Sequence, residues 1–296
     1  MMINKDEKPS KALVLSGGGV TGIAWELGIL FGLEECGIDV TSVELLVGTS
    51  AGSNVGAQIT SGLSLEELYQ LQLKPVKESK ENQKPLDGSQ FRQMMAAAIM
   101  SSPDPKTARI RIGEAALAAS TMSEEERLEL IASRLPSHEW NLKRNLIVNA
   151  VDAENGEWVT FNQHSDVSLL LAVTASSAVP GVYPPTTING HRYIDGSMSS
   201  GTNADLAKGY DLVLIIVAEP TMTHRAMGPT MHRISFEEEI AELEHSGSKF
   251  MIITPDGNSM QAKGNNPLDA NLRASSAMAG RKQGKKLAQK VKSFWE

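Results

Sequence analysis

Apolar residues in the N-terminal part of the chain follow two alternating patterns, short continuous runs and helical spacing. The run 12–15 stops at a glycine turn, and the apolar residues behind it recur at helical spacing as far as Cys36. A second run, 43–47, stops at another glycine-containing turn that leads into a further helical stretch. Strand, turn and helix thus occur twice, which predicts an α/β fold with a mostly parallel sheet covered by helices on both faces.

Further short apolar runs are predicted to add strands to this sheet. These runs cover residues 146–151, 158–161, 192–194, 212–217 and 250–253. Segment 74–122 has a different character, with a polar loop followed by a helical stretch rich in methionine and alanine. We interpret this segment as an insertion over the sheet, and we expect ligands to gather where the parallel strands end.

The insertion is a candidate lid. Its side chains Phe91, Met94, Met95 and Met100 are bulky or flexible and lie between polar loops. A mobile apolar cover would suit a cleft that takes up an acyl chain. A methionine stripe is also typical of an ordinary packed core, and the sequence leaves both interpretations open.

Residues 48–52 form a G-x-S-x-G pattern, which gains weight from its position between a buried strand and a helix. In such an elbow the small residues Gly48 and Gly52 let the backbone turn sharply and leave the hydroxyl of Ser50 exposed. The helix that follows directs its positive end at the reaction centre. The pattern predicts a nucleophilic serine, and the alternative is a structural turn in which Ser50 caps the helix.

The glycine turn formed by Gly17, Gly18 and Gly19 is the second candidate element. Attack on an ester carbonyl creates an oxyanion, and glycines allow backbone N–H groups to approach it closely. The same stretch spells G-x-G-x-x-G, which is weak evidence for a dinucleotide site. That alternative lacks both the acidic residue expected about twenty positions on and a Walker lysine. We therefore expect the glycines to form an oxyanion hole.

Asp195 is the third candidate, because it ends a short strand-like run. A serine hydroxyl needs a neighbouring proton acceptor to become a nucleophile, which favours Asp195 as the partner of Ser50 over its role as a plain turn residue. A Ser-His-Asp triad stays open, since His224, His232 and His245 follow in the chain order of an α/β-hydrolase. The dyad predicts that no single histidine is essential.

The composition permits a substantial core and narrows the class of protein. The 296 residues are 41% hydrophobic and 21% charged, as is usual for globular domains. The net charge of −7 argues against a nucleic-acid partner, since such proteins need a basic surface. The single Cys36 forms no internal disulfide, and neither a signal peptide nor a membrane-spanning run is apparent, so we expect a cytoplasmic protein.

Basic residues are concentrated at the C-terminal end. Residues 273–296 hold seven Lys or Arg against one Glu. They surround the apolar residues Leu287, Val291, Phe294 and Trp295 in the pattern of a basic amphipathic helix. A solvated terminal helix is one interpretation, and peripheral contact with an anionic membrane is the other.

The motifs follow one another in the order LVLSGGGVTGIAWELGIL, VGTSAGS, ASSAVPGVYPPTTINGHRYIDGS and TNADLA. Over residues 12–208 the chain resembles the patatin-like phospholipases. The resemblance implies a three-layer α/β/α sandwich, a dyad of Ser50 and Asp195, and an oxyanion hole at Gly17, Gly18 and Gly19. It also implies hydrolysis of lipid acyl esters, such as phospholipid or lysophospholipid, through an acyl-enzyme without cofactor or metal.

Two positions depart from the family pattern. Thr21 stands where an Arg or Lys is common, which puts help from a cation there in doubt, and Ser197 stands where Gly or Ala is usual. Residues 209–272 are expected to complete the same α/β unit, and residues 273–296 to form the basic tail. A non-catalytic lipid- or nucleotide-binding protein with the same fold is the rival interpretation.

Overall fold

The computed structural model describes residues 8–75, 88–223 and 228–296. In this part of the chain eight strands form one sheet: β1 (Lys11–Leu15), β2 (Leu45–Gly48), β3 (Leu146–Asp152), β4 (Trp158–Phe161), β5 (Thr186–Ile188), β6 (His191–Asp195), β7 (Leu212–Ile216) and β8 (Lys249–Ile253). The α-helices are α1 (Gly19–Glu34), α2 (Ala51–Ile59), α3 (Leu65–Leu73), α4 (Gly88–Met100), α5 (Pro105–Ala118), α6 (Glu124–Arg134), α7 (Leu169–Ser176), α8 (Phe236–His245), α9 (Gly257–Lys263) and α10 (Arg273–Trp295). Short 3₁₀ helices are η2 (Gly196–Met198), η3 (Ala204–Ala207), η4 (Pro220–Thr223) and η5 (Ala270–Leu272).

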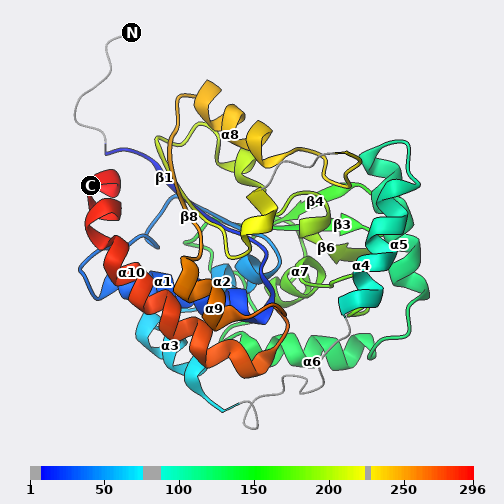
Figure 1. The fold of residues 1–296 in the computed structure, drawn as a ribbon, viewed down its shortest axis with the longest axis horizontal. Helices are drawn as coiled ribbons and strands as arrows, with labels where there is room; N and C mark the ends of the chain where they lie inside the picture. The colour runs from blue at the N-terminus through cyan, green and yellow to red at the C-terminus, as the bar shows by residue number, and fades with distance from the viewer. Residues whose placement is uncertain (1–7, 76–87, 224–227) are drawn as a thin grey trace.

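The strands are arranged in the order β5-β6-β3-β2-β1-β7-β8, and β4 pairs with β3 (Figure 1). The pairs β1 with β2, β1 with β7, β2 with β3, and β7 with β8 are parallel. The remaining pairs, which involve β4, β5 and β6, are antiparallel. The prediction of an α/β fold with a mostly parallel sheet is therefore confirmed. Strand β5 was not predicted, because its sequence Thr-Thr-Ile holds a single apolar residue and forms no apolar run.

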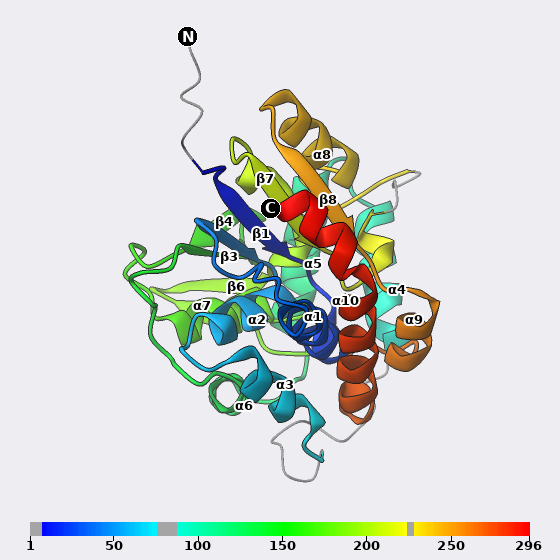
Figure 2. The same ribbon diagram turned by 90° about the vertical axis from the view of Figure 1, so that its left-hand side faces the viewer.

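Helices cover both faces of the sheet, as the sequence predicts. Along β1 the side chains of Leu13 and Leu15 pack into a core cluster with α1, α2, α7 and α10, whereas Ala12 and Val14 pack into a second cluster with η3 and α8. This division follows from the alternation of side chains in a strand. Figure 2 shows α8 above the sheet and α1, α2 and α7 below it. The layers therefore form an α/β/α sandwich.

The insertion forms the helical hairpin of α4 and α5 beside the antiparallel part of the sheet (Figure 1). Met95 is buried in a third cluster, together with Ile112 of α5 and Ile194 of β6. Met100 is 70% exposed. The side chain of Phe91 and residues 76–87, part of the polar loop, lie outside the described residues. In the described part of the hairpin Met95 is thus a core residue.

Helix α10 packs along α1 (Figure 1), and glycines allow their backbones to approach closely. A Cβ atom added to Gly284 would lie 2.5 Å from the carbonyl oxygen of Ile29. Val291 and Trp295, which the sequence places on an amphipathic surface, are buried against the core. The C-terminal segment is therefore a packed helix rather than a solvated tail. Among the described residues, none of the helices combines the length and apolar character that crossing a bilayer requires.

The contact between α1 and α10 generates a stability prediction. Alanine normally stabilises an exposed helix interior relative to glycine by about 1 kcal/mol. At position 284 the added methyl group would force the two backbones apart, so Gly284→Ala should lower the free energy of unfolding by roughly 1 to 3 kcal/mol. Urea denaturation followed by circular dichroism measures the change. The control is Gly257→Ala, where no atom lies within 4 Å of the added Cβ, and equal behaviour of both variants would contradict the prediction.

Candidate active site

Ser50 occupies a strained turn between β2 and α2. Its backbone angles are φ 52° and ψ −108°, in the left-handed half of conformational space that is uncommon for a residue with a Cβ atom. The amide of Ser50 donates a hydrogen bond to Ser176 Oγ at 2.9 Å, and the Gly52 amide donates to the Ser16 carbonyl at 2.8 Å. These bonds hold the turn against α7 and against the end of β1.

The glycines on either side of Ser50 are required by close backbone contacts. A Cβ atom on Gly48 would lie 2.7 Å from the carbonyl oxygen of Gly52. A Cβ atom on Gly52 would overlap the backbone of Leu15 in β1. Small residues therefore let the turn lie directly against the neighbouring strand, as the G-x-S-x-G pattern predicts.

Asp195 ends strand β6, which runs antiparallel to β3 and brings its carboxyl group to the nucleophile turn. Ser50 Oγ donates a hydrogen bond to Asp195 Oδ2 at 2.7 Å. The other carboxylate oxygen, Oδ1, accepts bonds from the amide of Ser197 at 2.8 Å and from its hydroxyl at 2.7 Å. Ser197, where the sequence departs from the family pattern, therefore anchors the carboxylate.

The carboxyl group of Asp195 is completely buried. Burial raises its pKa above the usual value, because the charged form is poorly solvated. The hydrogen bonds from Ser197 and Ser50 oppose this shift, as does the positive charge of Arg127. An aspartate with a raised pKa is a stronger base than an aspartate in water.

The glycine turn lies between the end of β1 and the start of α1. The amide of Gly17 donates to the carbonyl oxygen of Gly201 at 3.0 Å. Among the described residues, no hydrogen-bond acceptor is found for the amides of Gly18 and Gly19. Gly19 has a φ of 64° and lines the same cleft as Ser50. Of the three glycines predicted to form an oxyanion hole, Gly18 and Gly19 therefore have amides that can still donate a hydrogen bond.

A narrow cleft opens at Ser50. It is lined by Gly19, Val20, Ile23, Ser50, Ala51, Asn54, Arg127, Arg134, Ser177, Val179, Tyr183 and Leu268. Its volume is about 20 Å³, roughly the space of one water molecule. A long acyl chain requires this cleft to widen.

Two arginines of α6 give the cleft positive charge, which sequence reasoning missed. The Arg127 guanidinium lies 3.6 Å from the centre of the Tyr183 ring and donates to the Ser177 carbonyl at 2.9 Å. Arg134 lines the cleft as well. Because α6 follows the insertion and carries no motif, only the fold brings these cations to Ser50. Tyr183 and Val179 belong to the proline-containing loop 178–185 and add apolar side chains to the lining of the cleft.

In the described part of the chain, no histidine hydrogen-bonds to Ser50 or Asp195. The ring of His232 lies against the backbone of Ser197, and burial lowers its pKa. His245 lies in the last turn of α8, and His224 lies outside the described residues. The geometry pairs Ser50 directly with a carboxylate.

Within the described residues, one group of potential metal ligands lies at the end of β3 and the start of β6. The ligand atoms of Asp152, Glu154 and His191 lie within 4.8 Å of one another, and Asp152 alone is buried. His191 Nδ1 is 3.2 Å from Asp152 Oδ2. Asp152 Oδ1 also accepts hydrogen bonds from the amides of Glu154 and Asn155. Stabilising this turn is sufficient to account for the buried carboxylate. The sequence did not indicate this group, since its members come from separate strands and a turn.

The fold and site define an α/β protein in which a serine behind the parallel strand β2 pairs with a carboxylate at the end of the antiparallel strand β6. The model of the family described as patatin-like phospholipase matches residues 13–208. The chain therefore belongs to the patatin-like phospholipase family. A comparison with curated proteins found no match.

Solved structures with a similar arrangement include VipD from Legionella pneumophila, with 14% sequence identity and a TM-score of 0.46 over 96% of this chain and 67% of that one. The type III effector protein ExoU of Pseudomonas aeruginosa is 18% identical, with a TM-score of 0.42 over 96% and 53% of the chains. Human GIVD cytosolic phospholipase A2 is 10% identical, with a TM-score of 0.46 over 99% and 64%. The chain thus spans about half to two thirds of the length of these proteins.

The strain at Ser50 predicts a stability difference between two variants that both lack the hydroxyl. Ser50→Gly should be more stable than Ser50→Ala by about 1 kcal/mol, because glycine adopts the positive φ without the cost that alanine retains. Chemical denaturation of both variants measures the difference. A Ser50→Ala protein as stable as Ser50→Gly would show that the turn stores no strain.

Proposed function

We propose that the protein hydrolyses lipid acyl esters with Ser50 as nucleophile and Asp195 as its base. The observation that carries this proposal is the buried hydrogen bond of 2.7 Å between Ser50 Oγ and Asp195 Oδ2. Membership of the patatin-like phospholipase family supports a lipid acyl hydrolase in general. The dyad and its chemistry are the finer part of the proposal.

The reaction begins when Asp195 accepts the proton of Ser50 and the serine oxygen attacks the ester carbonyl. The amides of Gly18 and Gly19 and the N-terminal end of α2 stabilise the oxyanion. Collapse of this intermediate expels the alcohol, which takes the proton from Asp195, and leaves an acyl-enzyme. Water then attacks the acyl group while Asp195 again accepts a proton, and Asp195 returns this proton to Ser50 Oγ as the fatty acid departs.

The substrate class follows from the lining of the cleft. Val20, Ile23 and Leu268 suit an acyl chain, whereas Arg127 and Arg134 favour an anionic group near the ester. A phospholipid or lysophospholipid has both parts. Uptake requires the narrow cleft to open, and we keep the 74–122 segment as the proposed lid.

The buried hydrogen bond between Ser50 and Asp195 also distinguishes the acyl hydrolase from two alternative functions. A Ser-His-Asp esterase would need a histidine between the serine and the carboxylate, but Ser50 already donates directly to Asp195. A binding protein without turnover would not need a buried carboxylate against a strained serine, since both features cost stability. The acyl hydrolase therefore accounts for more of the geometry.

Active-site labelling provides the central test. Wild-type protein should react with a fluorophosphonate probe and hydrolyse p-nitrophenyl esters, and Ser50→Ala should abolish both reactions. Asp195→Asn should lower kcat by at least about 1,000-fold while leaving the fold intact, because the base is lost and the isosteric amide keeps the bonds to Ser197. Labelling that persists in Ser50→Ala would remove Ser50 from the mechanism. Substitution of each histidine in turn is the control, and each variant should keep its activity.

The pKa of Asp195 determines whether the reaction rate rises or falls with pH. The rate should rise with pH as the carboxyl group ionises, with a midpoint above the usual aspartate range because burial raises its pKa. Ionisation of a buried carboxyl group also costs stability as pH rises through the same range. Asp195→Asn should therefore be at least as stable as wild type near neutral pH, and thermal denaturation measures this. A clearly less stable variant would contradict the electrostatic argument.

The cations in the cleft generate a specificity prediction. Arg134→Gln should lower kcat/KM about tenfold for an anionic lysophospholipid and leave hydrolysis of a neutral p-nitrophenyl ester unchanged. Arg111→Gln is the matched control, because Arg111 of α5 binds Ser101 away from the cleft. An equal effect on both substrates would count against an anionic subsite.

A further inference from the structure

Residues 199–203, here called the linking segment, follow Asp195 and η2 and contact the other two parts of the site. The carbonyl oxygen of Gly201 accepts the amide of Gly17 in the glycine turn at 3.0 Å. The side chain of Asn203 donates to the hydroxyl of Thr49 at 3.0 Å, and that hydroxyl donates to the carbonyl of Thr202 at 3.3 Å. Thr49 is the residue directly before Ser50. The linking segment therefore connects the glycine turn, the nucleophile turn and the loop that carries Asp195.

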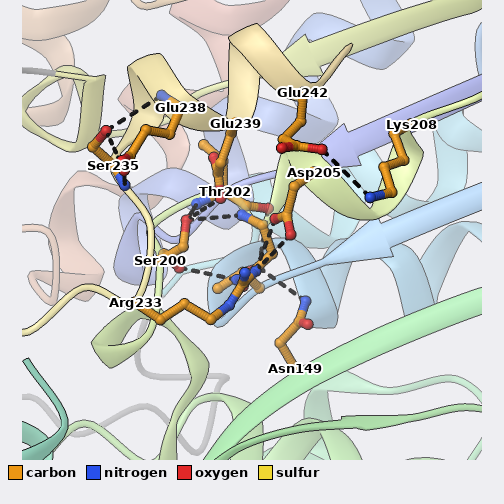
Figure 3. Close-up of polar contacts among 12 residues, drawn as sticks. Asn149, Ser200, Thr202, Asp205, Lys208, Arg233, Ser235, Glu238, Glu239 and Glu242 are labelled. Atoms are coloured by element: carbon orange, nitrogen blue, oxygen red, sulfur yellow. Dashed lines mark hydrogen bonds and ion pairs between the residues drawn. The ribbon is translucent and has the colours of Figure 1, made fainter. Parts of the chain in front are cut away.

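Glu239 of α8 holds the linking segment from the side opposite the cleft. Its side chain is completely buried and accepts hydrogen bonds from Ser200 Oγ at 2.5 Å and from Thr202 Oγ1 (Figure 3). Ser200 Oγ in turn accepts the amides of Thr202 at 3.2 Å and Asn203 at 3.0 Å. Figure 3 shows these groups between α8 and the linking segment.

The hydrogen bonds require a particular protonation state. A hydroxyl has one proton and two lone pairs, and both lone pairs of Ser200 Oγ are used by amides. Its proton must therefore point at an acceptor, which Glu239 supplies. An ionised carboxylate accepts both hydroxyls, whereas a protonated one must donate through one of its oxygens. Protonation of Glu239 thus breaks or reverses a bond to the linking segment.

We propose that Glu239 is a positioning residue for catalysis, whose ionised carboxylate fixes the linking segment and so keeps Ser50, Asp195 and the glycine amides aligned. This inference rests on the proposed acyl hydrolase function. Protonation of Glu239 loosens the linking segment and lowers the rate. Neither the family motifs nor the hydrogen bonds of Ser50 and Asp195 include this residue.

The surroundings of Glu239 allow this change near neutral pH. Burial raises the pKa of Glu239 to about 7, and the charge of Asp205 in η3 adds to the shift, while the bonds from Ser200 and Thr202 oppose it. The nearby Arg233, before α8, is paired with Asp205 at 2.8 Å.

The other elements packed on α8 bring few charges to Glu239. Lys208 pairs with Glu242 of α8 at 3.4 Å on the exposed side of the helix. Strand β8 contributes the apolar Phe250 and Ile252 to the same cluster, and η4 carries no ionisable side chain. Burial favours the neutral form of Glu239 in the folded protein. The folding stability that this neutral form contributes is therefore lost as pH rises from the pKa of the unfolded state towards about 7.

The test compares wild type with Glu239→Gln, which keeps the shape of the side chain. We measure ester hydrolysis and fluorophosphonate labelling between about pH 5 and 9, together with thermal denaturation. Wild type should show an inflection near 7 in kcat, which Glu239→Gln should lack. At high pH its kcat should be at least about tenfold lower with an unchanged KM, and its melting temperature should equal or exceed that of wild type. Glu242→Gln, on the exposed side of α8, is the matched control and should behave as wild type.

A second variant and a second readout keep the test independent of folding and turnover. Thr202→Val preserves the shape but removes one hydroxyl from Glu239, and it should also lower kcat. Hydrogen exchange of the amides of Thr202 and Asn203 should be faster in Glu239→Gln than in wild type at the same pH.

The outcomes separate the two proposals. Serine-dependent labelling of wild type with an unchanged kcat and pH profile in Glu239→Gln would overturn the inference and leave the acyl hydrolase intact. Unchanged hydrogen exchange would also overturn it. Absent labelling of wild type would instead contradict the proposed function, and the exchange measurement would still decide whether Glu239 orders the linking segment.

Discussion

The site depends on one backbone constraint, the left-handed conformation of Ser50 at the end of β2. The turn cannot relax without moving β1, because Gly52 lies directly against the backbone of Leu15 and donates to the carbonyl of Ser16. The bond from the Ser50 amide to Ser176 ties the same turn to α7. A sheet packed by helices on both faces can hold such strain, since its core resists the shifts that would release it.

The second important feature of the structure is the burial of two carboxyl groups near the site. Asp195 and Glu239 are both fully buried, and burial raises the pKa of each. Their ionised forms are held by hydroxyl and amide donors, Ser50 and Ser197 for Asp195, and Ser200 and Thr202 for Glu239. Ionisation of either group costs folding stability, because burial disfavours the charged form.

Sequence patterns located most strands because β1, β2 and β7, in the parallel part of the sheet, consist largely of buried apolar residues. Trp158–Phe161 was placed at its observed bounds, and the observed bounds of Lys11–Leu15 and Lys249–Ile253 differ from prediction by one residue. Predictions based on side-chain character alone were less accurate. Met95 packs in a core cluster, and α10 buries Val291 and Trp295 against the core, because an apolar helix face does not specify what covers it.

The sequence by itself determined the α/β class, the two glycine-bounded turns, and the identity of Ser50 and Asp195 as candidates, since these depend on residues near one another in the chain. Only the tertiary structure decided their distance, because the two residues are 145 positions apart. It also decided that the Gly17 amide is engaged by Gly201, and that α6 brings Arg127 to the cleft. Such contacts depend on how strands are ordered and paired, which the local pattern of residues does not encode.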